Sequence, residues 1–170
     1  MNRISTKKLV LTAIFMALTT ISTMFIRIPL PLGYVNLGDA FVLLSVFVLG
    51  PICGTITAGI GSAFADLLGY ITYAPGTLII KALMALTAYF TYKLVLKISK
   101  ITILSQIIAG VVATLIMAFG YFVYETIFFT TATIAIVSLP FNLLQGAVGT
   151  AVAVIVAKIL STTKLIDKLR

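Results

Sequence analysis

Long apolar runs with almost no charge inside them dominate this chain and limit what it can fold into. Of its 170 residues, 61% are hydrophobic and only 9% are charged, whereas a typical soluble domain carries about 25% charged residues. A soluble protein of this size would have too few polar side chains to cover its surface. We therefore expect residues 1–170 to form one integral membrane domain, an all-α bundle in the lipid bilayer.

Six apolar runs are suitable for the helices of that bundle. They cover about residues 9–26, 39–49, 52–70, 75–96, 101–124 and 140–160; a full span needs about 20 apolar residues, so the second run is short. The third run is rich in small residues and should pack at the centre of the bundle. The segment 27–38 holds two prolines and two glycines, which exclude a regular helix. It is too apolar for a solvated loop and should lie over one end of the bundle. The β-branched segment 126–138 forms either a loop or a continuation of the fifth helix.

The basic residues indicate how the chain lies in the membrane. The net charge is +8, from 12 Lys and Arg against 4 Asp and Glu. All but Arg27 and Lys81 lie in three terminal or connecting segments: Arg3, Lys7, Lys8, Lys93, Lys97, Lys100, Lys158, Lys164, Lys168 and Arg170. Because cytoplasmic segments of membrane proteins collect Lys and Arg, we predict six transmembrane helices with both termini in the cytoplasm. The basic excess then reflects topology, and we expect no nucleic-acid partner.

Several kinds of chemistry are excluded by the residues that are missing. The chain has no histidine and one cysteine, Cys53, which removes His-based catalysis, most transition-metal sites and any internal disulfide. It has no Gly-x-x-x-x-Gly-Lys-Ser/Thr motif for ATP hydrolysis. The Gly38-Asp39 pair lacks the fuller motif and the second deep aspartate of an intramembrane protease. We expect no enzyme activity, no cofactor and no metal.

The few polar residues gather in one half of the predicted bundle. Lys81 lies six residues into the fourth helix, and a lysine inside an apolar run costs roughly 2.5–3.5 kcal/mol, so it usually faces a cavity or a partner. With the predicted topology, the outer half also receives polar groups from separate stretches of chain. We predict a site for a small polar molecule formed by Asn36, Asp39, Asp66, Tyr73, Thr77, Lys81, Glu125, Asn142 and Gln145.

Each of these residues also has a structural interpretation. Lys81 either extends to the interface or pairs with Asp66, and Asp39 and Asn36 suit a helix start and a turn. Glu125 at a helix end can lie in water, and Asn142 and Gln145 share a helix face that suits helix packing or ligand contact. The tyrosines suit an interfacial belt or stacking on a flat ring: Tyr34, Tyr70, Tyr73, Tyr121 and Tyr124.

Two alanines four residues apart mark one face of the first helix. Small residues at this spacing let two helices approach closely in lipid. Ala13 and Ala17 therefore indicate either packing within this protein or contact with a partner.

Four stretches together resemble a known family. They are TAIFMALTT (12–20), GYVNLGDAFVLLSVFVLGPICGTITAGIGSAFADLLGY (33–70), YAPGTLIIKALMA (73–85) and LPFNLLQGAVG (139–149). They resemble the substrate-binding S components of energy-coupling factor (ECF) transporters, and look closest to the hydroxymethylpyrimidine or pyridoxine branch, with riboflavin-type members nearby.

The resemblance implies more than the spacing of residues shows. It implies a bacterial plasma-membrane protein that binds a water-soluble vitamin or precursor from outside, under a lid made by the first outer loop. It also implies association with a membrane T component and two cytoplasmic ATPases, with Ala13 and Ala17 contacting the T component. Two other classes stay open: a self-sufficient proton-coupled carrier with Asp66, Glu125 and Lys81 as a relay, and an assembly factor that binds no small molecule.

Overall fold

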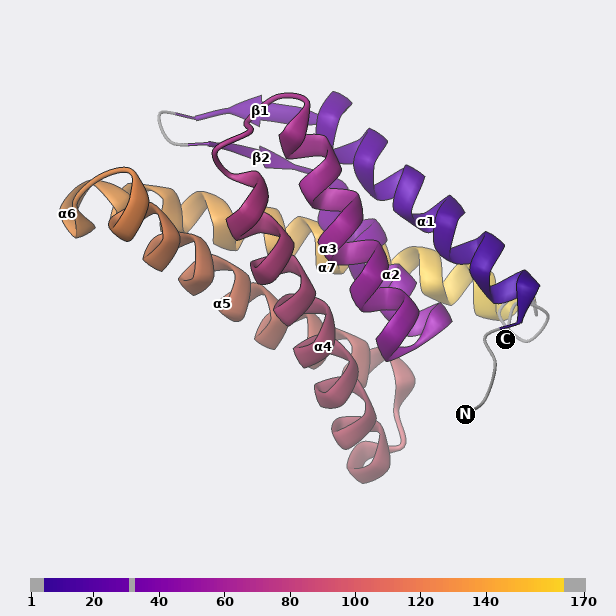
Figure 1. Ribbon diagram of the computed structural model, residues 1–170. Coiled ribbons are helices and arrows are strands. Elements are labelled where there is room, and N and C mark those ends of the chain that lie inside the picture. The colour runs from indigo at the N-terminus through magenta and orange to yellow at the C-terminus, as the bar shows by residue number, and fades with distance from the viewer. Residues whose placement is uncertain (1–4, 31–32, 164–170) are drawn as a thin grey trace.

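The protein is a bundle of helices with a small hairpin at one end (Figure 1). The computed structural model describes residues 5–30 and 33–163. The long helices are α1 (Thr6–Phe25), α2 (Gly38–Leu49), α3 (Pro51–Leu67), α4 (Ala74–Ser99), α5 (Thr102–Phe128) and α7 (Leu139–Thr162). The shorter elements are strands β1 (Arg27–Pro29) and β2 (Tyr34–Asn36), helix α6 (Ala132–Ala135) and a 3-10 turn over Ile136–Ser138. The six predicted helical runs each correspond to one long helix.

The expectation of an all-α fold is wrong at one place. Strands β1 and β2 pair antiparallel, with Arg27 opposite Asn36 and Pro29 opposite Tyr34. Gly33 closes the turn, with φ of +67° and its carbonyl accepting from the Leu30 N–H at 3.1 Å; this left-handed φ suits glycine. The non-helical segment was predicted, but three-residue strands are too short for an alternating pattern to reveal them. We call residues 27–36 the hairpin.

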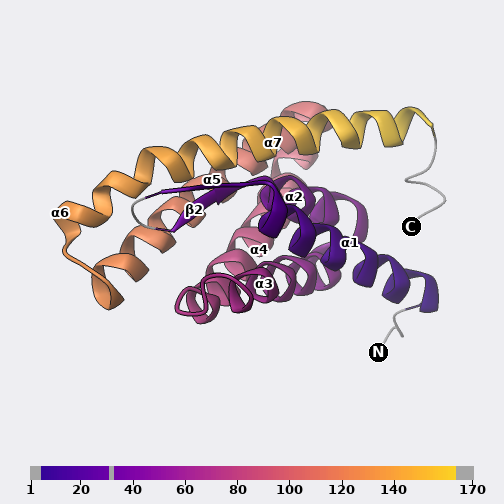
Figure 2. The same ribbon diagram turned by 90° about the horizontal axis from the view of Figure 1, so that it is seen from above.

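Helix α2 is the centre of the bundle. Nearly all of its side chains are buried, and it packs against α1, α3, α4 and α7. Figure 2 shows it between α7 and α3. A helix that is apolar all round is stable only when it is covered all round. The prediction that the third run lies at the centre is therefore wrong: α3 packs closely on α1, α2 and α4, but it also has an exposed apolar face that includes Ile52, Ile60 and Phe64.

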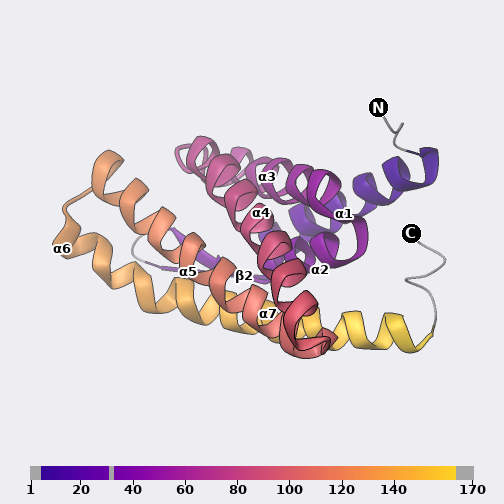
Figure 3. The same cartoon turned by 90° about the horizontal axis from the view of Figure 1, so that it is seen from below.

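Glycines allow close helix approach at several crossings. A Cβ on Gly61 would lie 3.0 Å from the Met16 carbonyl oxygen of α1. A Cβ on Gly146 of α7 would lie 2.2 Å from the Thr114 hydroxyl of α5, and Figure 3 shows these two helices side by side. Small residues at these crossings therefore let neighbouring backbones approach closely, as is usual for helices in lipid.

Four helices in the described residues are long and apolar enough to cross a membrane. They are α1, α4, α5 and the continuous helical segment Ala132–Thr162. Helix α2 has 12 residues, about 18 Å at 1.5 Å per residue. After α5 the chain turns, and the short α6 and the 3-10 turn lead into α7, so segment 126–138 is partly a continuation of α5 and partly a connector. The start of α1 and the end of α7 lie at the end of the bundle away from the hairpin and α6 (Figures 1 and 2).

Candidate functional site

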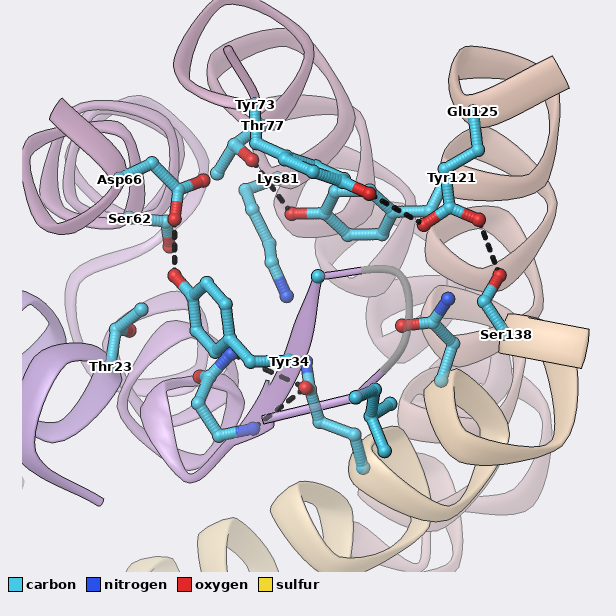
Figure 4. Close-up of a pocket in the computed structure, with 15 residues that line it drawn as sticks. Thr23, Tyr34, Ser62, Asp66, Tyr73, Thr77, Lys81, Tyr121, Glu125 and Ser138 are labelled. Atoms are coloured by element: carbon cyan, nitrogen blue, oxygen red, sulfur yellow. Dashed lines mark hydrogen bonds between the residues drawn. The ribbon is translucent and has the colours of Figure 1, made fainter. Parts of the chain in front are cut away.

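A polar pocket lies beneath the hairpin (Figure 4). Residues from strand β2 and the turn before it, from α1, α3, α4, α5 and α7, and from the 3-10 turn before α7 converge on it. The lining residues are Thr23, Leu30, Gly33, Tyr34, Asn36, Ser62, Asp66, Tyr73, Thr77, Lys81, Tyr121, Glu125, Ser138, Asn142 and Gln145. The open interior is about 30 Å³, room for roughly two water molecules. A flat aromatic ring enters only if lining side chains shift.

A buried ion pair forms the floor of the pocket. The Lys81 ammonium on α4 contacts the Asp39 carboxylate on α2, and these side chains are 3% and 1% exposed. The ammonium also lies 3.0 Å from the Met117 sulfur and 5.6 Å from the centre of the Tyr121 ring. Neither predicted structural role of Lys81 is correct, because it reaches neither the interface nor Asp66 for its ion pair. Asp39 lies in the first turn of α2, where the helix dipole also stabilises a carboxylate.

Gln145 on α7 joins this floor to the hairpin. Its amide nitrogen donates to the Asp39 carboxylate at 2.7 Å. Its amide oxygen accepts from the backbone N–H of Asn36 at 2.8 Å and from the Asn36 side chain at 3.2 Å. The Asn36 oxygen in turn accepts from the Gly38 N–H at 2.8 Å. Asn36 thus has the predicted turn role and also lines the pocket.

Asp66 and tyrosines form one wall. The Tyr34 hydroxyl donates to Asp66, and the Tyr34 ring packs 4.7 Å from the Tyr70 ring, centre to centre. The Arg27 guanidinium lies over both rings, at 5.6 and 5.4 Å from their centres. Burial, and then the Asp66 charge, raise the pKa of the Tyr34 phenol well above its ordinary value, so it remains a donor. This bond ties the hairpin to α3.

Glu125 forms the opposite wall, as Figure 4 shows. The Ser138 hydroxyl donates to one carboxylate oxygen, and the Tyr73 hydroxyl lies 3.4 Å from the other. Burial raises the pKa of the Tyr73 phenol, which therefore stays protonated. Glu125 is 2% exposed, so the expectation that it lies in water at a helix end is wrong. Between the walls, the Thr77 and Tyr121 hydroxyls share a hydrogen bond of 3.0 Å.

Asn142 differs from its neighbour Gln145. Its side chain lines the pocket and is 8% exposed. Within residues 5–30 and 33–163, no hydrogen bond of its amide is found, and its amide atoms are not among the fully buried unpaired atoms, so they stay accessible from the pocket. A buried amide usually finds partners in protein or water. Asn142 therefore offers two donors and an acceptor to whatever enters the pocket.

The structure brings eight of the nine predicted site residues to the pocket lining, and places the ninth, Asp39, behind Lys81. Sequence reasoning did not include Thr23, Leu30, Gly33, Ser62 and Ser138. Ser62 precedes Asp66 by four residues on α3, so their shared helix face was an available signal. Of the tyrosines, Tyr34, Tyr73 and Tyr121 line the pocket, whereas the Tyr124 hydroxyl donates to the Thr72 carbonyl at 2.7 Å.

Two further expectations concern metals and the first helix. The described residues contain no group of three His, Cys, Asp or Glu side chains that suits a metal ion. Ala13 and Ala17 are exposed on the outside of α1, beside the exposed Ile14 and Leu18. These alanines therefore lie on the outer surface of the described bundle.

The fold and the pocket define a class of protein. A solved structure titled "Structure and mechanism of the S component of a bacterial ECF transporter" superposes with a TM-score of 0.69, covers 92% of this chain and 96% of its own, and is 24% identical. The chain thus has the fold of an ECF S component. It is also 45% identical over 64 residues, or 36% of its length, to an uncharacterized protein of Pyrococcus woesei, and the match spans 43% of that relative.

The family follows from a match over nearly the whole chain. Residues 3–162 match the family described as "ECF-type riboflavin transporter, S component". The chain belongs to this family of ECF S components. It is therefore a multi-pass membrane protein, and its family consists of transporter subunits, not enzymes.

Proposed function

We propose that this chain is the substrate-binding S component of an ECF transporter that imports a water-soluble vitamin or vitamin precursor. One observation carries the proposal. Polar side chains from the hairpin, α3, α4, α5 and α7 meet in one pocket, inside a protein whose surface is rich in exposed leucine, isoleucine and phenylalanine. Binding sites for small molecules typically combine aromatic walls with a few polar groups that fix orientation.

We propose six membrane spans with both termini in the cytoplasm. Ten of the twelve basic residues support this topology through the positive-inside rule. Helices α2 and α3 are short for a span, at 12 and 17 residues. Because α2 is covered by other helices, its length need not match the bilayer. The pocket then opens to the outside, under the hairpin as a lid.

The proposed ligand is a flat heteroaromatic vitamin. The rings of Tyr34, Tyr73 and Tyr121 suit stacking against such a ligand. Hydroxymethylpyrimidine and pyridoxine are single rings, so this narrow pocket needs a smaller rearrangement to admit them than to admit riboflavin. Riboflavin is the vitamin in the name of the matched family. We therefore propose these three as the ligands to test.

The experiment is mass spectrometry of the small molecule that co-purifies with the full-length protein, followed by titration of the emptied protein with each vitamin. We expect one of the three to be recovered and to bind with one-to-one stoichiometry. Recovery of no small molecule, together with no binding of any of the three, would favour an assembly factor and contradict the proposal.

The proposed partners are a membrane T component and two cytoplasmic ATPases. The outward position of Ala13 and Ala17 on α1 supports a close helix contact at this face. The competing class is a proton-coupled carrier that uses Asp66, Glu125 and Lys81. Uptake by the protein alone, in vesicles with a proton gradient and no ATPase, would favour that carrier.

A further inference from the structure

Three of the four acidic residues of this chain meet at one pocket. The chain has a net charge of +8 and only four Asp and Glu residues. Asp39, Asp66 and Glu125 are 0%, 2% and 2% exposed, and each lines the pocket or contacts a residue that does. Burying a carboxylate costs free energy unless the group is paired with a cation or well hydrogen-bonded. The partners of each carboxylate therefore indicate which kind of ligand the pocket binds.

Within residues 5–30 and 33–163, only one of these three carboxylates, Asp39, forms an ion pair. Asp39 pairs with Lys81, so the one ammonium in the pocket is already neutralised. Asp66 accepts from the neutral Tyr34 hydroxyl, and Glu125 accepts from the neutral Ser138 and Tyr73 hydroxyls. Arg27, for which no ion pair is found among the described residues, is exposed and lies over the Tyr34 and Tyr70 rings rather than lining the pocket.

The same pocket holds an amide that points to a ligand independently. Asn142 is 92% buried, since its exposed fraction is 8%, lines the pocket, and has no hydrogen-bond partner among the described residues. The pocket therefore presents acceptors at Asp66 and Glu125 and a mixed donor and acceptor at Asn142. It presents no unpaired cation within the part of the chain that the structure describes.

We propose that this pocket selects its vitamin by charge, a refinement that rests on the proposed function. It takes an uncharged or cationic heteroaromatic molecule whose hydroxyl, amino or ring N–H groups donate to Asp66 and Glu125. It rejects the phosphorylated form of the same molecule, because a phosphate brought between these walls meets carboxylate acceptors and finds no free cation.

The test compares matched ligand pairs that share one ring and differ by a phosphate. Isothermal titration of the full-length protein in nanodiscs at pH 7.5 uses riboflavin against flavin mononucleotide, pyridoxine against pyridoxine 5′-phosphate, and hydroxymethylpyrimidine against its phosphate ester. For the vitamin that binds, the phosphorylated form is expected to bind at least 100-fold more weakly. Equal affinity would overturn the inference and leave the proposed function standing. Binding of neither form in any of the three pairs would contradict the proposed function and the inference together.

A pair of isosteric substitutions separates charge from size. In the double variant Asp66→Asn and Glu125→Gln, the amide oxygens still accept from Tyr34 and Ser138, but the negative charges are gone. The ratio of the affinity for the vitamin to the affinity for its phosphorylated form is expected to fall at least tenfold. Asp167→Asn removes the remaining acidic residue, which lies outside the described residues, and is expected to leave the ratio unchanged. A ratio that stays at 100-fold in the double variant would show that the phosphate is excluded by its size, and would overturn the inference.

Discussion

Lys81 on α4 and Asp39 on α2 form an ion pair that is almost completely buried beneath the pocket. Asp39 also accepts from Gln145 of α7 at 2.7 Å, so the pair connects three helices. The central helix α2 is thereby fixed to the floor of the pocket. The two groups differ in role: Lys81 lines the pocket, whereas Asp39 holds Lys81 from behind.

Breaking this pair should destabilise the protein strongly. Lys81→Ala or Asp39→Ala leaves one charge buried without its partner, which typically costs about 3–5 kcal/mol. The double variant Lys81→Met with Asp39→Leu removes both charges and should recover most of the loss. Thermal unfolding followed by circular dichroism in detergent measures the three variants. Single variants that melt at the parent temperature would show that the pair contributes nothing to stability.

Gln145→Ala should also lower stability. It leaves the Asp39 oxygen and the Asn36 amide without their partner from α7, and each unsatisfied buried group costs about 1–3 kcal/mol. The neighbouring Leu144 is 59% exposed, so Leu144→Ala is the matched control and should melt close to the parent. If both variants melt alike, the bridge from α7 to the hairpin does not hold the fold.

The sequence could place the polar residues in one half of the bundle but not assign their partners. Alternating helix directions fix which end of each helix reaches which membrane face. This reasoning grouped Asp66, Glu125 and Gln145, which all line the pocket. Hydropathy does not determine which helices lie side by side in the bundle. The ion-pair partner considered for Lys81 was therefore Asp66, the acidic residue on the preceding long helix, whereas the structure pairs it with Asp39 on the covered helix α2.

Other parts of the site were not visible in the sequence for local reasons. Each strand of the hairpin is three residues long, which is too short for a period of two to stand out from the prolines around it. Thr23 and Ser138 are small hydroxyl residues among apolar neighbours. In membrane helices such residues commonly pack or bond to their own backbone, so nothing marked these two for the pocket.

Tyr34→Phe should release the hairpin from α3. The variant removes the hydroxyl that donates to Asp66, and losing such a bond to a buried group costs about 1–3 kcal/mol, or roughly five- to more than a hundredfold in an equilibrium. Stopped-flow displacement of the bound vitamin should show faster dissociation. Tyr92→Phe, on a buried tyrosine at the other end of the bundle, is the control. An unchanged dissociation rate in Tyr34→Phe would contradict a role of this bond in retaining ligand.

Ala13→Trp and Ala17→Trp should block association with the T component while leaving vitamin binding intact. Both positions are exposed on α1, and a bulky side chain prevents the close approach that small residues allow. Pull-down of the T component measures association. Ile155→Trp, on the exposed face of α7, controls for a large side chain elsewhere on the surface. An undiminished complex with both alanine variants would assign this face to lipid.

The most direct test of the binding site is a titration of the vitamin into the parent protein and Asn142→Ala in parallel. Asn142 has no hydrogen-bond partner among the described residues, so its removal should leave the melting temperature of the ligand-free protein nearly unchanged. The variant should bind the vitamin at least tenfold more weakly, which corresponds to about 1.4 kcal/mol of binding free energy. The control is Lys93→Ala, which changes an exposed lysine outside this pocket and should bind the vitamin as the parent does. Parent-like affinity in Asn142→Ala would contradict the account, because it would place the vitamin somewhere other than the pocket beneath the hairpin.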